Sequence, residues 1–146
     1  MGTRAKVTLP PEIRASIVEL ARRERPNEAC GLIVGDGPAR EGGRPLRWVA
    51  TRNALASPYR YEIDGDDLLR VTIETDERGE SIWGIVHSHV ASPARPSATD
   101  IRQAFYPDAL YLLVSLDPLE ADPTTGAESV RAWWIVDGTV REVTLA

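Results

Sequence analysis

The feature that most constrains this chain is a mostly apolar run, residues 82–90, which carries both of its histidines. Glycine and proline residues bound the run, and this pattern predicts a buried β-strand. Side chains two residues apart in a strand point to the same face, and the Cα atoms of His87 and His89 would lie about 6.5 Å apart. Two imidazoles placed in this way can bind one metal ion as a chelate.

Length and charge narrow the class of protein. A chain of 146 residues has the length of one domain, and folding at that size buries roughly 68–70% of the surface of the unfolded chain, which is enough for one core. The formal net charge of -5, with acidic and basic residues interspersed, argues against a nucleic-acid-binding surface. We therefore expect one domain over residues 1–146 and no nucleic-acid partner.

Cysteine content and apolar stretches indicate the compartment. The single cysteine, Cys30, excludes an intramolecular disulfide and a cysteine-rich zinc site, so a metal here would need nitrogen and oxygen ligands. Residues 1–11 contain no apolar stretch typical of a signal peptide, and the longest apolar run, residues 109–114, is too short to span a bilayer. We expect a cytoplasmic protein that does not enter a membrane.

Helix and strand signals alternate along the chain. The predicted helices are residues 10–25, 65–78 and 97–105. The predicted strands are residues 27–35, 46–53, 82–90, 109–116, 130–136 and 139–145, and the last two are joined by a tight turn at 137–138. This pattern predicts an α/β fold in which one mixed β-sheet is flanked by about three helices.

Two local expectations concern residues 54–73. Residues 54–63 fit a short extended piece with Tyr59, Tyr61 and Ile63 on one face. Asp64 is the expected N-cap of the second helix. The inner face of that helix is predicted to use Leu68, Leu69, Thr72 and Ile73.

A possible third metal ligand follows the histidine strand. Asp100 lies eleven residues after His89, in the first turn of a helix predicted to open at Ser97. A helix starting at the end of a strand can aim its first-turn side chains back over that end, so His87, His89 and Asp100 are a plausible ligand set for a catalytic zinc. Ser97 and Asp100 also resemble a capping box, and a metal-bound carboxylate has less freedom to turn back to a cap. Spacing alone does not decide between these two roles.

The wider pattern resembles a known family. Glu28 is followed downstream by His87-Ser88-His89, seven residues, Ser97, two residues and Asp100. This resembles the signature of the JAMM, or MPN-plus, metallopeptidases: Glu, then His-Ser/Thr-His, seven residues, Ser, two residues and Asp. The run Glu28-Ala29-Cys30-Gly31 and the order of the elements are similar to the small bacterial branch, so the resemblance covers most of the chain. Many members have proline after the second histidine, where this chain has Val90.

The resemblance implies a fold, a cofactor and residue roles. It implies a JAMM/MPN fold of the cytidine-deaminase-like type, with one Zn²⁺ per chain held by His87, His89 and Asp100. Glu28 would be the general base, although without the resemblance it reads as an ordinary carboxylate at the start of a strand. Ser97 would donate its hydroxyl to the oxyanion that forms during amide hydrolysis.

The resemblance also implies a substrate class. Members act at the C-terminal tail of ubiquitin-like proteins, and the small bacterial ones resemble enzymes that process ubiquitin-like sulfur-carrier proteins, in the best-known arrangement releasing cysteine. A zinc peptidase or isopeptidase in cysteine or sulfur-transfer metabolism is therefore the expected function. Two alternatives stay open: a hydrolase with the same metal site acting on another peptide substrate, and a non-catalytic MPN-type scaffold. Scaffold members usually lack ligands, whereas this chain has the full set.

The remaining notable residues have simpler interpretations. Ser88 points away from the histidines in a regular strand, which favours packing or a supporting hydrogen bond. Cys30 has no histidine left to activate it, so a small buried residue is expected. The four tryptophans are expected in the core and the sheet. Trp133 and Trp134 must face opposite sides, so one of them could mark a partner surface or the underside of a helix.

Overall fold

The computed structural model describes residues 5–146. Residues 1–4, part of the stretch in which we predicted no signal peptide, lie outside the described part. Its centre is a seven-stranded sheet with the strand order β1-β7-β6-β5-β4-β2-β3. The pairs β4–β5 and β1–β7 are parallel and the others antiparallel, so the predicted mixed sheet is confirmed. The strands are β1 (Lys6–Val7), β2 (Cys30–Gly35), β3 (Pro45–Thr51), β4 (Ser81–His89), β5 (Leu110–Ser115), β6 (Ser129–Val136) and β7 (Thr139–Leu145).

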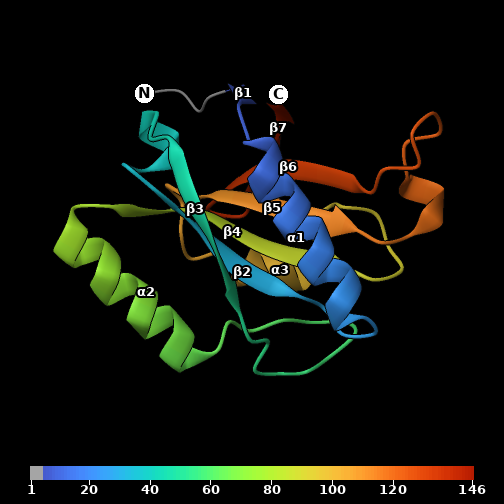
Figure 1. Ribbon diagram of the computed structural model, residues 1–146, viewed down its shortest axis with the longest axis horizontal. Coiled ribbons are helices and arrows are strands. Elements are labelled where there is room, and N and C mark those ends of the chain that lie inside the picture. The colour runs from blue at the N-terminus through green and yellow to red at the C-terminus, as the bar shows by residue number, and fades with distance from the viewer. Residues whose placement is uncertain (1–4) are drawn as a thin grey trace.

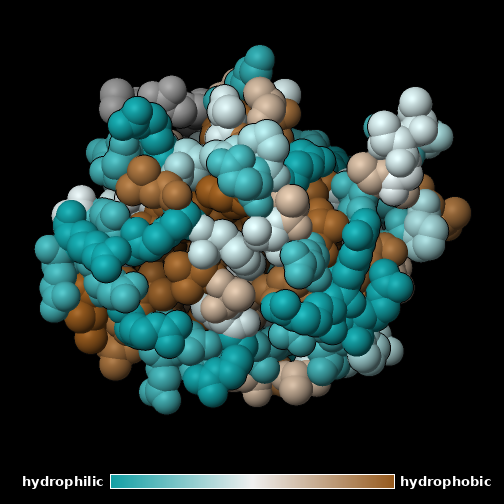
Figure 2. Space-filling model, viewed as in Figure 1, coloured by the Kyte–Doolittle hydropathy of each residue, from teal (hydrophilic) through white to brown (hydrophobic). Residues whose placement is uncertain are grey.

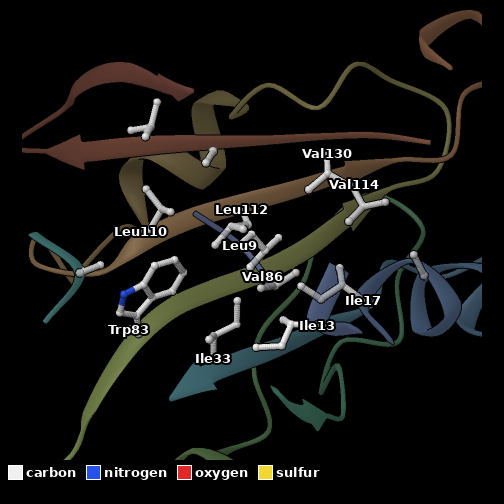
Figure 3. Packing of buried hydrophobic residues seen from close by; sticks show 14 of the residues in the cluster. Leu9, Ile13, Ile17, Ile33, Trp83, Val86, Leu110, Leu112, Val114 and Val130 are labelled. Atoms are coloured by element: carbon white, nitrogen blue, oxygen red, sulfur yellow. The ribbon is translucent and has the colours of Figure 1, made fainter. Parts of the chain in front are cut away.

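Three helices flank the sheet (Figure 1). They are α1 (Pro11–Glu24), α2 (Gly65–Arg78) and α3 (Ala98–Arg102), and two single-turn 3₁₀ helices lie at Ala39–Glu41 and Pro118–Glu120. Helix α1 packs on one face, where Ile13 and Ile17 join Ile33, Trp83 and Val86 in the first hydrophobic core (Figure 3). Helices α2 and α3 pack on the other face, over a second core. The sheet thus separates two cores, and this is the predicted architecture.

The alternation along β4 decides which core surrounds the histidines. The pairing of β4 with β2 shifts between Ile33 and Val34, which places an extra residue in β4 at Trp83. After this bulge Val86 faces the α1 core and Ile85 faces the second core. His87 and His89 therefore point toward the second face, on which α2 and α3 lie.

Helix α2 begins where the sequence predicts but presents a different face. Asp64 is the N-cap and accepts from the amide of Asp67 at 3.1 Å, as expected. The predicted inner face is wrong in part, because Leu69 and Ile73 are 58% and 48% exposed. The buried residues are instead Asp67, Val71 and Thr75. Asp67 turns inward because its carboxylate accepts from the backbone amide of Arg52 at 2.9 Å, a contact that an apolar pattern does not reveal.

Helix α3 is shorter than predicted. It ends at Arg102 instead of continuing to about residue 105, and Phe105 is exposed. The amide of Tyr106 donates to the hydroxyl of Tyr111 at 3.1 Å, and Pro107 disfavours a helical conformation at residue 106. The chain therefore leaves the helix early and turns into β5.

Smaller differences occur at strand ends and at one loop. Strand β2 starts at Cys30, three residues later than expected, and β1 was not predicted. The expected common face of residues 54–63 is wrong for Tyr59, which is 85% exposed, whereas Tyr61 packs against the second core. The predicted turn between β6 and β7 is confirmed, with positive φ values of 50° at Asp137 and 78° at Gly138.

The outer surface is predominantly polar on the side of α1. Figure 2 shows hydrophilic residues over most of this face, with smaller hydrophobic areas between them. Within residues 5–146, every helix is too short or too polar to cross a membrane.

Candidate metal centre

The two histidines are the last same-face pair of β4. Strand β4 lies between β2 and β5, and His87 is in register with Cys30 on one side and Leu113 on the other. Both imidazoles are buried, and their Nε2 atoms lie 3.2 Å apart. The sequence prediction that the two rings share one face and converge is confirmed by this geometry.

Asp100 approaches the same point from the first turn of α3. Its Oδ2 atom lies 3.1 Å from Nε2 of His87 and 3.2 Å from Nε2 of His89. Burial alone would raise the pKa of Asp100, but hydrogen bonds with the two histidines hold the pKa well below its ordinary value. One carboxylate oxygen and two imidazole nitrogens thus meet in one small buried space.

The capping box of α3 is present as well. The hydroxyl of Ser97 accepts from the amide of Asp100 at 3.1 Å, and the amide of Ser97 donates to Oδ2 of Asp100 at 2.8 Å. In this geometry the cap and the approach of Asp100 to the two imidazoles are present together, and whether a bound metal ion would compete with the cap stays a prediction. The same oxygen faces both the Ser97 amide and the imidazoles, and the cap fixes the direction in which the carboxylate points.

His89 is oriented by a backbone carbonyl. Its Nδ1 lies 2.7 Å from the carbonyl oxygen of Pro93, and the carbonyl can only accept, so Nδ1 carries the proton. The lone pair of a neutral ring is then on Nε2, which points to Asp100. Burial alone would lower the pKa of His89, but the hydrogen bonds with Asp100 and Pro93 raise it above its ordinary value.

His87 is supported in another way. Within residues 5–146 its Nδ1 atom is buried and has no hydrogen-bond partner. The ring instead stacks on Tyr61, with ring centroids 4.2 Å apart and an interplanar angle of 17°. Burial lowers the pKa of His87, which favours the neutral imidazole that a metal ion binds.

Glu28 lies immediately before β2 and is 4% exposed. Its Oε1 atom is buried and has no hydrogen-bond partner in the described part of the chain. Burial raises the pKa of Glu28 to about 7, while the charges of His89 and Asp100 act on the carboxyl in opposite directions. A carboxyl group with a pKa near neutrality is suited to taking up and returning a proton.

Two neighbours of the site behave as the sequence predicts. Ser88 is buried and accepts from the amide of Ala29 at 2.8 Å, which ties β4 to the residue after Glu28. Cys30 is buried beside Thr51, and burial raises the pKa of its thiol to about 11. The thiol is therefore protonated at neutral pH and unsuited to act as a nucleophile.

The tryptophan pair of β6 faces opposite cores, as predicted. Trp134 belongs to the α1 core and Trp133 to the second core, and both are buried. The suggestion that one of them marks a partner surface is therefore wrong. The indole nitrogen of Trp133 donates to the carbonyl of Ala94 at 3.0 Å, so Trp133 instead supports the loop between β4 and α3.

The donor set fits a divalent metal ion. In the described part of the chain, the ligand atoms of His87, His89 and Asp100 all lie within 4.8 Å of one another. Imidazole nitrogens combined with a carboxylate oxygen suit zinc and several other transition metals. The orphaned Oε1 of Glu28 adds a free acceptor near this group, as expected for a residue that handles a proton.

This fold and this centre define a class of protein. The chain belongs to the family described as prokaryotic homologs of the JAB domain, whose model matches residues 10–136. The similarity to the JAMM, or MPN-plus, family that the sequence predicts is thereby confirmed.

Individual relatives cover nearly the whole chain. The CysO-cysteine peptidase of Mycobacterium tuberculosis is 37% identical over 142 residues, which are 97% of this chain and 90% of that protein. The desampylase of Haloferax volcanii is 32% identical over 133 residues, 86% of this chain and 93% of that protein. The solution structure of a protein from Desulfitobacterium hafniense has a TM-score of 0.76 and 33% identity and covers 95% of this chain and 90% of that one.

Sequence reasoning missed several supporting residues. Tyr61 was assigned to an extended segment without a role, and Asn53, Ser115 and Trp133 were not connected to the site. Tyr61 contacts a histidine of the site, and the other three bind backbone carbonyls of Glu28 or of the loop between β4 and α3. The spacing of residues along the chain contains no signal for contacts between such distant segments.

Proposed function

We propose that this chain is a zinc-dependent peptidase or isopeptidase that hydrolyses an amide bond at the C-terminal tail of a ubiquitin-like sulfur-carrier protein. The observation that carries the proposal is the convergence of His87, His89 and Asp100 on one buried point. The charges of His89 and Asp100 act on the carboxyl group of Glu28, whose buried Oε1 atom has no partner in the described residues. The similarity to the CysO-cysteine peptidase and to the desampylase supports the reaction and the substrate class.

One Zn²⁺ per chain is the proposed cofactor, held by Nε2 of His87, Nε2 of His89 and a carboxylate oxygen of Asp100. A zinc ion in such a set supplies Lewis-acid chemistry, which polarises a carbonyl group and lowers the pKa of water from about 15.7 to about 7. The protein residues fix the geometry. Pro93 sets the tautomer of His89, and Ser97 sets the direction of Asp100.

Glu28 is the proposed general base. Its carboxylate accepts a proton from the attacking water and later returns that proton to the leaving amine. The low exposure of Glu28 keeps bulk water from competing for its free Oε1 acceptor. In the metal-free protein burial raises the pKa of this carboxyl group to about 7. A nearby zinc ion would favour the carboxylate, which is the form that accepts a proton.

Ser97 is the proposed oxyanion donor. Its Oγ atom already accepts from the amide of Asp100, and this leaves the hydroxyl hydrogen free to donate. The side chain is fixed as the N-cap of α3 and lies at the exposed side of the centre, where a substrate carbonyl can approach. A donor held in advance stabilises the negative charge that forms on the carbonyl oxygen during hydrolysis.

The released group is the finer part of the proposal. We infer that the chain removes a C-terminal residue, cysteine in the arrangement that the family resemblance implies, in the cytoplasm. The similarity to a CysO-cysteine peptidase supports a carrier with a C-terminal cysteine as the substrate. The similarity to a desampylase is a reason to test also carriers whose C-terminal tail is joined to another protein. The complete donor set and the buried carboxyl group of Glu28, with its Oε1 atom left without a partner in the described residues, argue against a purely non-catalytic scaffold.

The test is intact-mass spectrometry of candidate carriers. Ubiquitin-like carrier proteins carrying a C-terminal cysteine, another C-terminal residue or an isopeptide-linked lysine are incubated with the zinc-loaded protein, with and without chelator. We expect loss of the added residue only in the absence of chelator. Full activity of metal-free protein would overturn the mechanism, and no cleavage of any carrier would overturn the substrate class.

A variant separates the base from the ligands. Glu28→Gln is expected to retain one zinc per chain while turnover falls, because an amide cannot accept the proton from water. Zinc content is measured by elemental analysis of the purified variant. Loss of zinc from Glu28→Gln would instead make Glu28 a ligand.

A further inference from the structure

We propose that Asn53 is a positioning residue for this centre, because its side chain holds the backbone of Glu28 and fixes Tyr61 against His87. The inference rests on the proposed function for the roles of Glu28 and His87. Asn53 follows the edge strand β3 and touches neither the ligand atoms nor the carboxyl group of Glu28. Its effect is therefore exerted through the backbone of Glu28 and through the segment 53–62, whose Tyr61 stacks on His87.

The first contact reaches the general base. Nδ2 of Asn53 donates to the carbonyl oxygen of Glu28 at 3.0 Å. The amide of Glu28 donates to the carbonyl oxygen of Ser57 at 2.8 Å. Both backbone polar groups of Glu28 are thus bound by residues 53–57, and the position of its side chain depends on how this segment is held.

Asn53 also binds the residues immediately before and after Tyr61. Nδ2 of Asn53 also donates to the carbonyl of Arg60 at 3.0 Å, and Oδ1 accepts from the amide of Glu62 at 3.1 Å. Oδ1 accepts a further hydrogen bond from the amide of Leu55 at 3.0 Å. All four hydrogen-bonding positions of the carboxamide are therefore used, and two of them bracket Tyr61.

Tyr61 in turn supports a ligand that lacks the usual partner. A histidine that binds a metal ion through one nitrogen normally donates its other N–H to an oxygen, which fixes the ring. Nδ1 of His87 has no such partner within residues 5–146, and the ring stacks on Tyr61 at 4.2 Å. The ring of His87 is therefore supported by Tyr61, and Asn53 binds the backbone on both sides of Tyr61, together with the bond from the amide of Ala54 to the carbonyl oxygen of Glu62.

This role requires a carboxamide at position 53. Asparagine supplies two donors and one oxygen that accepts twice, whereas aspartate keeps the oxygens but has no donor. In Asn53→Asp the carboxylate would face the carbonyl oxygens of Glu28 and Arg60 and repel both. The contacts to Leu55 and Glu62 would survive, so this nearly isosteric change removes two hydrogen bonds selectively.

The main experiment uses the full chain and two measurements that need no substrate. The protein has only two histidines, so imidazole NMR spectra of metal-free and zinc-loaded protein contain only the signals of His87 and His89. In Asn53→Asp we expect the His87 signals to lose the ring-current shift caused by Tyr61. We expect zinc affinity, measured by competition with a chelator, to fall roughly 10–100-fold. Turnover on a carrier substrate should fall on the order of 100-fold.

Asn27→Asp is the matched control. It introduces the same charge one residue from Glu28, but the side chain of Asn27 makes no hydrogen bond with the described residues. We expect zinc affinity and turnover within about twofold of the wild type. An Asn53→Asp protein with an unshifted His87 signal and wild-type turnover would overturn the proposal, as would equal losses in both variants.

Tyr61 variants keep the proposal testable if Asn53→Asp fails to fold. Tyr61→Leu should lose the His87 shift and roughly 10–100-fold in zinc affinity, and Tyr61→Phe should restore both because it keeps the ring. Wild-type zinc affinity in Tyr61→Leu would overturn the link between Asn53 and His87. If the wild type cleaves no carrier, the proposed function fails, while the NMR and zinc measurements still decide the role of Asn53.

Discussion

Two irregular segments border the metal centre, and they are anchored differently. The loop 90–96, between β4 and α3, is held by three separate donors that bind three consecutive carbonyl oxygens. The bonds run from Oγ of Ser115 to Ser92 at 2.7 Å, from Nδ1 of His89 to Pro93 at 2.7 Å and from Nε1 of Trp133 to Ala94 at 3.0 Å. In the segment 53–62, by contrast, one side chain, the carboxamide of Asn53, makes four of the hydrogen bonds. Backbone bonds, such as that from the amide of Ala54 to the carbonyl oxygen of Glu62 at 2.8 Å, accompany them.

This difference in hydrogen bonding indicates which of the two segments tolerates a substitution. In the loop 90–96 the loss of one donor removes one hydrogen bond and leaves two others. In the segment 53–62 the loss of the Asn53 side chain removes hydrogen bonds on both sides of Tyr61 at once, and only bonds such as that between Ala54 and Glu62 remain. The three donors also explain how Val90 can occupy the position where many family members have proline. Side chains from β4, β5 and β6 fix the path of the loop, so the chain does not need the restricted φ of a proline there.

The largest effect is expected from replacing Asp100, the proposed metal ligand in the helix that follows the loop 90–96. Asp100→Ala removes the oxygen that faces both imidazoles and the Ser97 amide. We expect zinc affinity to fall by more than the roughly 10–100-fold that loss of a supporting residue costs, and activity to fall with it. Chelator competition and zinc content of the purified protein measure this loss.

Asp100→Asn separates the cap from the ligand. The amide oxygen can still accept from Ser97, but it lacks the charge that favours a metal ion. We therefore expect stability near that of the wild type and weakened zinc binding. Wild-type zinc affinity in Asp100→Ala would mean that Asp100 serves only the capping box.

The second prediction concerns Ser97 and separates its effect on turnover from its effect on zinc binding. Ser97→Ala should lower turnover roughly 10²–10³-fold, equivalent to about 2.7–4 kcal/mol, because it removes the oxyanion donor. Zinc content should stay at one ion per chain, and loss of the cap should cost about 1 kcal/mol of stability. Steady-state kinetics with Ser97→Thr as the hydroxyl-bearing control would show whether the hydroxyl matters; equal turnover in Ser97→Ala would exclude it as a donor.

Much of the centre could be predicted because strand and helix periodicity place side chains over short distances. His87 and His89 share a face in any regular strand, and Asp100 follows them within one loop and one helical turn. The mixed sheet with three helices follows from the order of the elements. Glu28 lies 59 residues before His87, and only the resemblance to a family connected the two.

The remainder depends on hydrogen bonds between distant segments. The pairing of β2 with β4 sets Cys30 beside His87 and so brings Glu28 to the centre. Asp67 accepts a hydrogen bond from the amide of Arg52, and this contact orients α2. The hydroxyl of Tyr111 accepts from the amide of Tyr106, where the chain has already left α3. A polar side chain that binds a distant backbone group leaves no periodic trace in the sequence, and for this reason the role of Asn53 was also missed.

The third prediction concerns Glu28, whose backbone the segment 53–62 holds. In metal-free protein, burial raises the pKa of Glu28 from its ordinary value of 4.5 to about 7. Between these values the folded state binds more protons than the unfolded state, so the free energy of unfolding should decrease as the pH rises through this window. The total decrease from this group should reach at most roughly 3 kcal/mol.

Urea unfolding in the presence of chelator, at about pH 5 and about pH 8, measures this effect. Glu28→Gln cannot ionise and should lack this contribution, so the variant should be more stable than the wild type at the higher pH. The same pH dependence in both proteins would show that Glu28 ionises freely and is not constrained by its surroundings.

The smallest effect is expected from removing one of the three anchors of the loop 90–96. Ser115→Ala leaves the carbonyl of Ser92 without its donor and should cost about 1–3 kcal/mol of stability. Turnover should stay within about tenfold of the wild type, because His89 and Trp133 still hold the adjacent carbonyls, whereas Asn53→Asp should lose on the order of 100-fold. Kinetics of both variants, assayed together, test the contrast directly.

Trp133→Phe keeps the ring under Arg131 but removes the donor to Ala94, so it is the companion variant. Each single change should be mild, and the double variant with Ser115→Ala should lose more turnover than the two single losses combined, because only one anchor then remains. If Ser115→Ala alone were as damaging as Asn53→Asp, the three donors of the loop would not share its support. Distributed anchoring would then not explain how the chain functions with Val90 in place of proline.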